Sequence, residues 1–98
     1  MNMKAVMLLF DSELVEETLL MIRISNIQNY THFTGLHGSS KGGKKEGSAA
    51  WPGTNEIIMI LLTDDEMIKL KKVISDFKVK HPGSPFLFFN WPLNEVVV

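Results

Sequence analysis

The sequence predicts a single α+β domain whose elements follow one another in the order β-α-β-β-α-β. Two observations predict this class. Four short segments have the apolar or alternating character of strands, and two longer segments repeat apolar residues at the three- and four-residue spacing of an amphipathic helix. The chain length of 98 residues is that of one ordinary domain, so we expect residues 1–98 to fold as one unit.

In the N-terminal half, residues 4–10 form a continuous apolar run that predicts the first strand. Asp11 and Ser12 follow it, and both are favoured helix N-cap residues. The next turns carry acidic residues, which the positive end of a helix dipole stabilises. They are Glu13, Glu16 and Glu17. Apolar residues at helical spacing continue to about Asn26, and residues 28–33 alternate in the manner of a second strand.

In the C-terminal half, residues 56–62 form another continuous apolar run and predict the third strand. Thr63 and Glu66 have the spacing of a capping box, in which each side chain bonds the backbone amide of the other residue, and they predict a helix start. The apolar stripe of that helix is Met67, Leu70, Ile74 and Phe77. Residues 81–83, His-Pro-Gly, end the helix, and residues 85–91 predict the fourth strand.

This order is the split βαβ, or ferredoxin-like, arrangement: a four-stranded antiparallel sheet with both helices on one face. The helix-free face of such a sheet normally alternates with polar residues. The runs 4–10, 56–62 and 86–91 are instead apolar on both sides. We therefore expect further copies of the chain to cover that face, because an exposed apolar patch of this size favours aggregation. The alternative is that the C-terminal tail or residues 35–53 fold over it.

Residues 35–53, between the second and third strands, are rich in glycine, serine and lysine. A structureless segment of this length is uncommon in a small domain and is usually functional or disordered. Residues 38–45 nearly match the P-loop pattern, but Lys45 stands where that pattern has serine or threonine, and no helix follows. We expect a mobile loop whose lysines and amides contact an anion, the alternative being a solvated disordered loop. A rigid turn anchors its return: Trp51, Pro52 and Gly53.

Four short stretches are typical of one protein superfamily. They are residues 3–6 (MKAV), 47–55 (GSAAWPGTN), 80–83 (KHPG) and 91–97 (WPLNEVV). With the order of elements and the long segment between the second and third strands, they resemble the PII-like superfamily of signalling proteins, named for the nitrogen regulatory protein PII, and in particular a small uncharacterised branch of it. The resemblance implies a homotrimer whose sheets pack together, with a regulatory role and not an enzymatic one.

The resemblance also implies where ligands bind. In PII-like trimers, small molecules such as adenine nucleotides bind in clefts between subunits, and the loop between the second and third strands contacts ligands or partner proteins. In this chain residues 35–38 and the turn of residues 80–84 would line the cleft. Residues 81–85 read HPGSP where signalling members have a glycine-rich, basic turn. The expected ligand is a small, nucleotide-like anion. The candidate ligand-binding residues are Gly35, His37, Gly38, Lys41, Lys44, Lys45, Lys80, His81, Gly83 and Ser84.

Composition excludes several classes of protein. The chain has no cysteine and a formal net charge of −1, so we expect no disulfide, no cysteine-ligated metal and no nucleic-acid partner. No apolar run reaches membrane-spanning length, so we expect no membrane insertion and a cytoplasmic location. No Ser–His–acid arrangement can be argued from spacing, so the sequence names no catalytic residue and no cofactor.

Two alternatives to a regulatory role stay open. The first is a trimeric divalent-metal-binding protein of the ion-tolerance kind. No metal site is predicted outright, because the histidines lack the spacing of a helical metal pair, and the candidate ligands are His32 and His37. The second alternative is a small-molecule enzyme at the subunit cleft.

Overall fold

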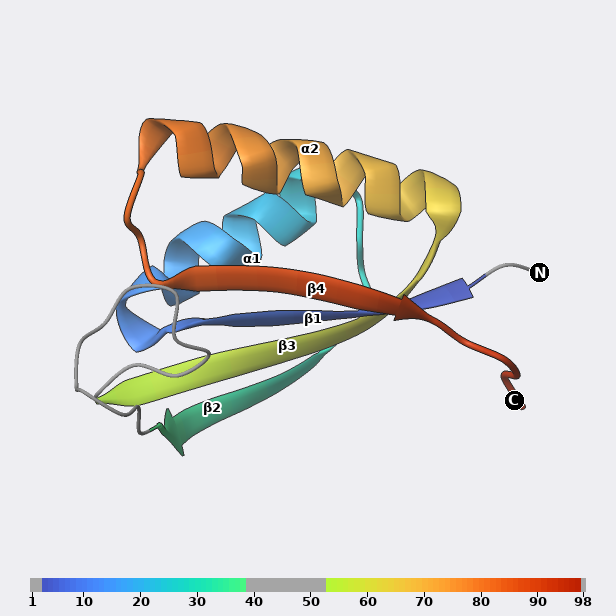
Figure 1. The fold of residues 1–98 in the computed structure, drawn as a ribbon, viewed down its shortest axis with the longest axis horizontal. Coiled ribbons are helices and arrows are strands. Elements are labelled where there is room, and N and C mark those ends of the chain that lie inside the picture. The colour runs from blue at the N-terminus through green and yellow to red at the C-terminus, as the bar shows by residue number, and fades with distance from the viewer. Residues whose placement is uncertain (1–2, 39–52, 98) are drawn as a thin grey trace.

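The computed structural model describes residues 3–38 and 53–97, which form one four-stranded antiparallel sheet with two helices packed on one face (Figure 1). The strands are ordered β2-β3-β1-β4, and every neighbouring pair is antiparallel. The predicted order of elements and the ferredoxin-like fold are therefore confirmed. The elements are β1 (Met3–Asp11), the short 3-10 helix η1 (Ser12–Leu14), α1 (Val15–Ile24), β2 (Thr31–His37), β3 (Thr54–Thr63), α2 (Asp64–Lys80) and β4 (Phe86–Pro92).

The predicted capping residues are in place at the start of each helical segment. The Asp11 carboxylate accepts a hydrogen bond from the Glu13 amide over 2.9 Å and caps η1, which leads into α1. At α2, the Thr63 hydroxyl accepts from the Glu66 amide at 3.3 Å, and the Glu66 carboxylate accepts from the Thr63 amide at 3.0 Å. These are the two bonds of a capping box, so the predicted start of α2 is confirmed.

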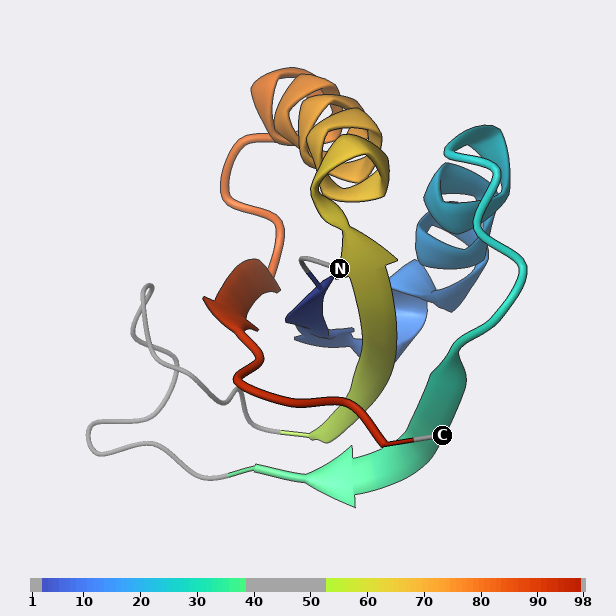
Figure 2. The ribbon, with the colours of Figure 1, turned by 90° about the vertical axis from the view of Figure 1, so that its right-hand side faces the viewer.

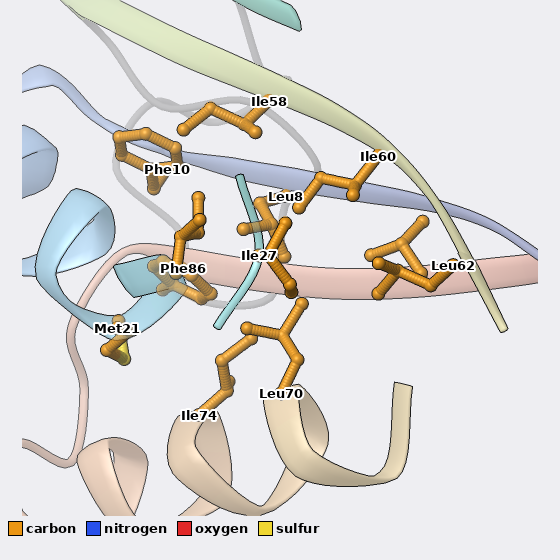
Figure 3. Packing of buried hydrophobic residues seen from close by; sticks show 12 residues of the cluster. Leu8, Phe10, Met21, Ile27, Ile58, Ile60, Leu62, Leu70, Ile74 and Phe86 are labelled. Atoms are coloured by element: carbon orange, nitrogen blue, oxygen red, sulfur yellow. The ribbon is translucent and has the colours of Figure 1, made fainter. Parts of the chain in front are cut away.

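The hydrophobic core lies between the sheet and the two helices (Figure 3). Alternate residues of each strand point toward the helices, as strand geometry requires. The buried set from the strands is Val6, Leu8, Phe10, Ile58, Ile60, Leu62 and Phe86. The helices and the connection after α1 add Met21, Ile22, Ile27, Leu70 and Ile74. Each large side chain buried in this way stabilises the fold by about 1.5–3 kcal/mol.

The opposite face of the sheet carries no helix in the described part of the chain (Figures 1 and 2). The strand register places Met7 of β1 between Met59 of β3 and Phe89 of β4. Leu61 is 51% exposed and Phe89 is 42% exposed, so the expectation of a sheet that is apolar on both sides is confirmed. We call this surface the open face; its large apolar residues are Met7, Leu9, Phe33, Ile57, Met59, Leu61, Leu87, Phe89 and Trp91.

The C-terminal tail, residues 93–97, leaves the body past one end of the sheet (Figure 1). The Leu93 amide donates to the Met3 carbonyl over 3.2 Å, and Val97 is 85% exposed. Leu61 and Phe89 are exposed even though the tail is present in the structure, so the tail leaves the open face accessible. Among the described residues, no helix is long and apolar enough to cross a bilayer.

The second strand is longer than the sequence pattern predicts. β2 continues to His37, so Gly35 and His37 lie in a strand where the sequence predicts the base of a loop. The reason is an irregularity in the pairing of β2 with β3 between Phe33 and Leu36. This irregularity interrupts the alternation of side chains on which a sequence-based strand assignment depends.

Candidate functional site

Glu56 lies near the start of β3, on the face that packs against the helices, and is only 3% exposed. The register of β2 against β3 shifts between Phe33 and Leu36. Thr34 and Gly35 therefore oppose Glu56 alone, which is the geometry of a β-bulge. Gly35 has a φ of 69°, a left-handed conformation that glycine adopts without strain. Its amide consequently points toward the Glu56 carboxylate and not along the ladder of strand hydrogen bonds.

The Glu56 carboxylate joins three segments of the chain. The Ser12 hydroxyl, in η1 after β1, donates to Oε2 of Glu56 over 2.7 Å. The Gly35 amide, in β2, donates to the same oxygen over 3.0 Å. His32 Nε2 lies 2.9 Å from Oε1, and the Thr34 side chain makes a further hydrogen bond. A buried carboxylate with this many donors fixes η1, β2 and β3 relative to one another.

These hydrogen bonds set the charge state of Glu56. Burial by itself raises the pKa of Glu56, because it removes water from the charged form. The hydrogen bonds from Gly35, Ser12, Thr34 and His32 stabilise that charged form and more than offset the burial, so the pKa of Glu56 falls from 4.5 to about 2. Glu56 is therefore a carboxylate at neutral pH.

The side chains of Ser12, Glu56 and His32 do not form a relay that activates a nucleophile. In such a relay the serine hydroxyl donates to the histidine, and the acid orients the histidine. In this chain the Ser12 hydroxyl donates directly to Glu56, and His32 bonds the other carboxylate oxygen. Neither residue activates the other, so the chemistry of the cluster is positioning and not reaction.

The two candidate metal ligands differ in their surroundings. His32 bonds Glu56 and its ring stacks on Phe10, with ring centroids 6.5 Å apart. His37 is exposed at the end of β2. Within residues 3–38 and 53–97, no three His, Cys, Asp or Glu side chains are grouped so that they could hold a metal ion. In this part of the chain neither His32 nor His37 therefore belongs to a group of three metal-ligating side chains.

A second charged side chain holds the turn between α2 and β4. Lys78 donates through Nζ to the carbonyl oxygen of Ser84 over 3.2 Å and to that of Phe86 over 3.0 Å. The His81 ring packs on the Phe77 ring, with centroids 4.8 Å apart. The sequence predicts this turn as one wall of a ligand cleft. Two side chains of α2, Lys78 and Phe77, hold it in place.

The Ser12 segment lies beside this turn. The Asp11 amide donates to the Pro85 carbonyl over 3.0 Å, so the end of β1 meets the start of β4. Since Ser12 also bonds Glu56, and Glu56 bonds Gly35, the α2–β4 turn and the β2 bulge lie at the same end of the sheet (Figure 1). Lys80 and His81 are exposed at the end of α2.

The remaining residues of the predicted site divide into two groups. Gly38 follows β2 directly, and Gly53 and Gly83 have positive φ values of 96° and 84°. The Ser84 amide donates to the His81 carbonyl over 3.3 Å, within the turn. The other predicted residues lie outside the described part of the chain: Lys41, Lys44, Lys45, Trp51 and Pro52.

Sequence reasoning does not select Ser12, Glu56 or Lys78 as site residues. The sequence does contain a signal for Glu56. Alternate residues of a strand lie on the same face, so Glu56 points toward the core together with Ile58 and Ile60. A lone acid at such a position needs hydrogen-bond donors. Nothing comparable marks Lys78, whose partners are backbone carbonyls.

An open groove of about 360 Å³ runs between α1 and α2. Its apolar lining includes Leu20 and Ile24, which are 50% and 60% exposed. Lys80 and His81 also line it. These two predicted site residues therefore line an outer surface between the helices.

Comparison with known proteins gives matches of structure only. No protein-family model and no curated protein matches the chain. A protein of Thermus thermophilus assigned to the PII-like signalling proteins superposes with a TM-score of 0.68 at 14% identity, covering 94% of this chain and 87% of its own length. CPII of Thiomonas intermedia, a nitrogen regulatory PII-like protein solved with ADP, AMP and bicarbonate, superposes with a TM-score of 0.65 at 10% identity, covering 99% of this chain and 98% of its own.

This chain has the PII-like fold. The resemblance inferred from short sequence stretches is thereby confirmed at the level of fold. A functionally unknown protein from Pediococcus pentosaceus also superposes on this chain, with a TM-score of 0.68 and 11% identity over 100% of this chain and 98% of its own. The solved examples of this fold include signalling and regulatory proteins.

Proposed function

We propose that this chain is a regulatory protein of the PII-like kind, and not an enzyme, which assembles as a homotrimer and binds a small anionic ligand between its subunits. The observation that carries the proposal is the apolar open face in a PII-like fold. A chain of 98 residues has one side of its sheet covered by its own helices. Association through the other side removes apolar area from water, which is worth about 25 cal/mol per Å².

The proposed ligand site is the cleft between residues 35–38 and the α2–β4 turn. Two features support it: both walls lie at one end of the sheet (Figure 1), and Lys80 and His81 bring hydrogen-bond donors to that end. CPII was solved with ADP, AMP and bicarbonate, and we extend an anionic ligand of this chemistry to the present chain. The full proposed set is Gly35, His37, Gly38, Lys41, Lys44, Lys45, Lys80, His81, Gly83 and Ser84.

In this proposal residues 35–53 transmit the signal. Ligand contacts change the conformation of that segment, and the changed segment alters what a protein partner binds. The regulatory role is favoured over an enzymatic one because the Ser12–Glu56–His32 cluster, which lies near the proposed cleft, positions backbone and activates no nucleophile.

The assembly is tested by multi-angle light scattering of the purified protein at micromolar concentration. The expected mass is three times the 11.1 kDa of one chain. A species that stays monomeric throughout this concentration range would overturn the trimer, and with it a ligand cleft between subunits.

The ligand is tested by a thermal-shift screen with ADP, AMP, ATP, bicarbonate and divalent metal ions. A saturating ligand raises the melting temperature in proportion to its binding free energy. Lys80→Ala should weaken anion binding roughly tenfold, the worth of one charged hydrogen bond. Lys71→Ala, an exposed lysine of α2 farther from the turn, should leave it unchanged. A shift with metal ions alone would replace this proposal with the metal-binding alternative.

A further inference from the structure

A chain of polar contacts crosses the end of the sheet from the α2–β4 turn to the β2 bulge. It begins at Lys78, which holds the carbonyls on either side of Pro85. The Pro85 carbonyl accepts from the Asp11 amide over 3.0 Å. The next residue, Ser12, donates to Glu56 over 2.7 Å, and Glu56 accepts from the Gly35 amide over 3.0 Å. Within this chain of contacts Glu56 and Phe86 are buried, and Asp11 is paired with Asn55 of β3.

The two ends of this chain of contacts lie on different edge strands. The sheet order β2-β3-β1-β4 puts the bulge on one outer strand and the α2–β4 turn beside the other. The contacts therefore span the full width of the sheet through residues of β3 and of the β1–α1 connection. They are contiguous, which is the physical requirement for transmitting a displacement between two sites.

The central link is the Oε2 atom of Glu56. Ser12 and Gly35 donate to this same oxygen, whereas His32 bonds Oε1. A movement of Ser12 therefore changes the position or the strength of the acceptor on which the Gly35 amide depends. Gly35 has few other constraints, because its φ of 69° is open to glycine and an added Cβ would meet nothing within 4 Å.

We propose that the Ser12–Glu56 hydrogen bond couples the α2–β4 turn to the β2 bulge, so that the position of the turn sets the geometry of Gly35. The proposal deepens the proposed function and rests on it in one respect: these two places are the proposed walls of the ligand cleft. Ser12, Glu56 and Lys78 are positioning residues in this scheme. They touch backbone on either side of the cleft and need not touch the ligand.

The test is a double-mutant cycle in the ligand-free protein, with amide hydrogen exchange of Gly35 measured by NMR. Lys78→Met releases the turn while keeping most of the apolar stem of the side chain. Ser12→Ala removes the central link. Lys71→Met is the matched control, because Lys71 is an exposed lysine of the same helix outside this chain of contacts. The Leu8 amide, in the central strand β1, reports whether each variant keeps its global stability.

We expect Lys78→Met to speed Gly35 exchange roughly tenfold in the parent, the worth of a weakened charged hydrogen bond. In the Ser12→Ala background the same change should be less than about twofold, because the link is already broken. If Lys78→Met leaves the exchange rate of the Gly35 amide unchanged in the parent, or changes it equally in both backgrounds, the proposed coupling is wrong.

A reciprocal measurement keeps the proposal falsifiable if Lys78→Met does not fold. Energetic coupling between two sites acts equally in both directions, so Ser12→Ala should speed exchange of the Ser84 amide, which bonds His81 within the turn. An unchanged Ser84 amide overturns the proposal. Both measurements are made without ligand, so they decide the coupling even if no nucleotide or anion binds, an outcome that would contradict only the proposed function.

Discussion

The Ser12 hydroxyl donates to the Glu56 carboxylate over 2.7 Å, although the two residues are 44 positions apart in the sequence. Ser12 stands where a helix N-cap is expected, but the carboxylate of Asp11 makes the cap bond instead. Ser12 is thereby free for a tertiary contact, and the first connection of the chain is attached to the third strand. This attachment and the Gly35 contact make Glu56 the residue on which the geometry of this end of the sheet depends.

Replacing Glu56 with glutamine should lower the free energy of unfolding at pH 7 by about 2–3 kcal/mol. The amide keeps the shape of the side chain but loses the charge, and its NH₂ group would face donors such as Ser12 and Gly35. Urea denaturation of the two proteins measures the difference. Glu95→Gln, in the exposed tail, is the control and should change stability by less than about 0.5 kcal/mol. Equal effects of the two substitutions would contradict the buried network.

Glu56 should also give the stability of the protein a distinct dependence on acid pH. Its pKa in the folded protein is about 2, below the ordinary value of 4.5, so the folded state favours the charged form. Its contribution, roughly 3 kcal/mol, is fully present above pH 4.5 and is lost as the pH falls toward 2. Denaturation midpoints between pH 7 and pH 2 measure this loss. Glu56→Gln should flatten that part of the profile, and an unchanged profile would show that Glu56 does not titrate in this way.

The sequence predicts the fold because each local pattern agrees with the final structure. The capping box at Thr63 and Glu66, the apolar stripe of α2 and the continuous apolar strands all recur in the structure. The end of β2 is the exception. A bulge with Gly35 in a left-handed conformation interrupts the alternation of side chains that marks a strand. Residues 35–37 are therefore predicted as part of the loop.

The candidate site is less accessible to sequence reasoning because its contacts are tertiary. Gly35 can be selected as a flexible loop residue, but nothing local to it indicates that its amide bonds a carboxylate of β3. Lys78 has the same difficulty, since it bonds carbonyl oxygens beyond the end of its own helix. Only the register of the strands and the direction of the α2–β4 turn bring these partners together.

Replacing Thr63 with alanine should lower the free energy of unfolding by about 1 kcal/mol, the usual worth of an N-cap side chain. The hydroxyl of Thr63 accepts from the Glu66 amide, and alanine leaves that amide without its cap. Thr63→Ser keeps the hydroxyl and is the matched control. Thermal unfolding of both variants at neutral pH measures the difference. A serine variant as unstable as the alanine variant would mean that the methyl group of Thr63, and not the cap, provides the stability.

The open face yields the sharpest test of assembly, because one charge should separate the subunits without unfolding them. Phe89 is 42% exposed, stacks on Trp91 with ring centroids 6.1 Å apart and lies across from Met7. Phe89→Lys would bury an unpaired charge in a sheet-to-sheet interface, which costs several kcal/mol per subunit, yet in a single chain the lysine reaches water. We expect light scattering to show monomers, with circular dichroism unchanged. Val79→Lys, at an 80% exposed position of α2, is the control and should leave the assembly intact. If Phe89→Lys stays assembled like the control, the open face is not where the copies meet.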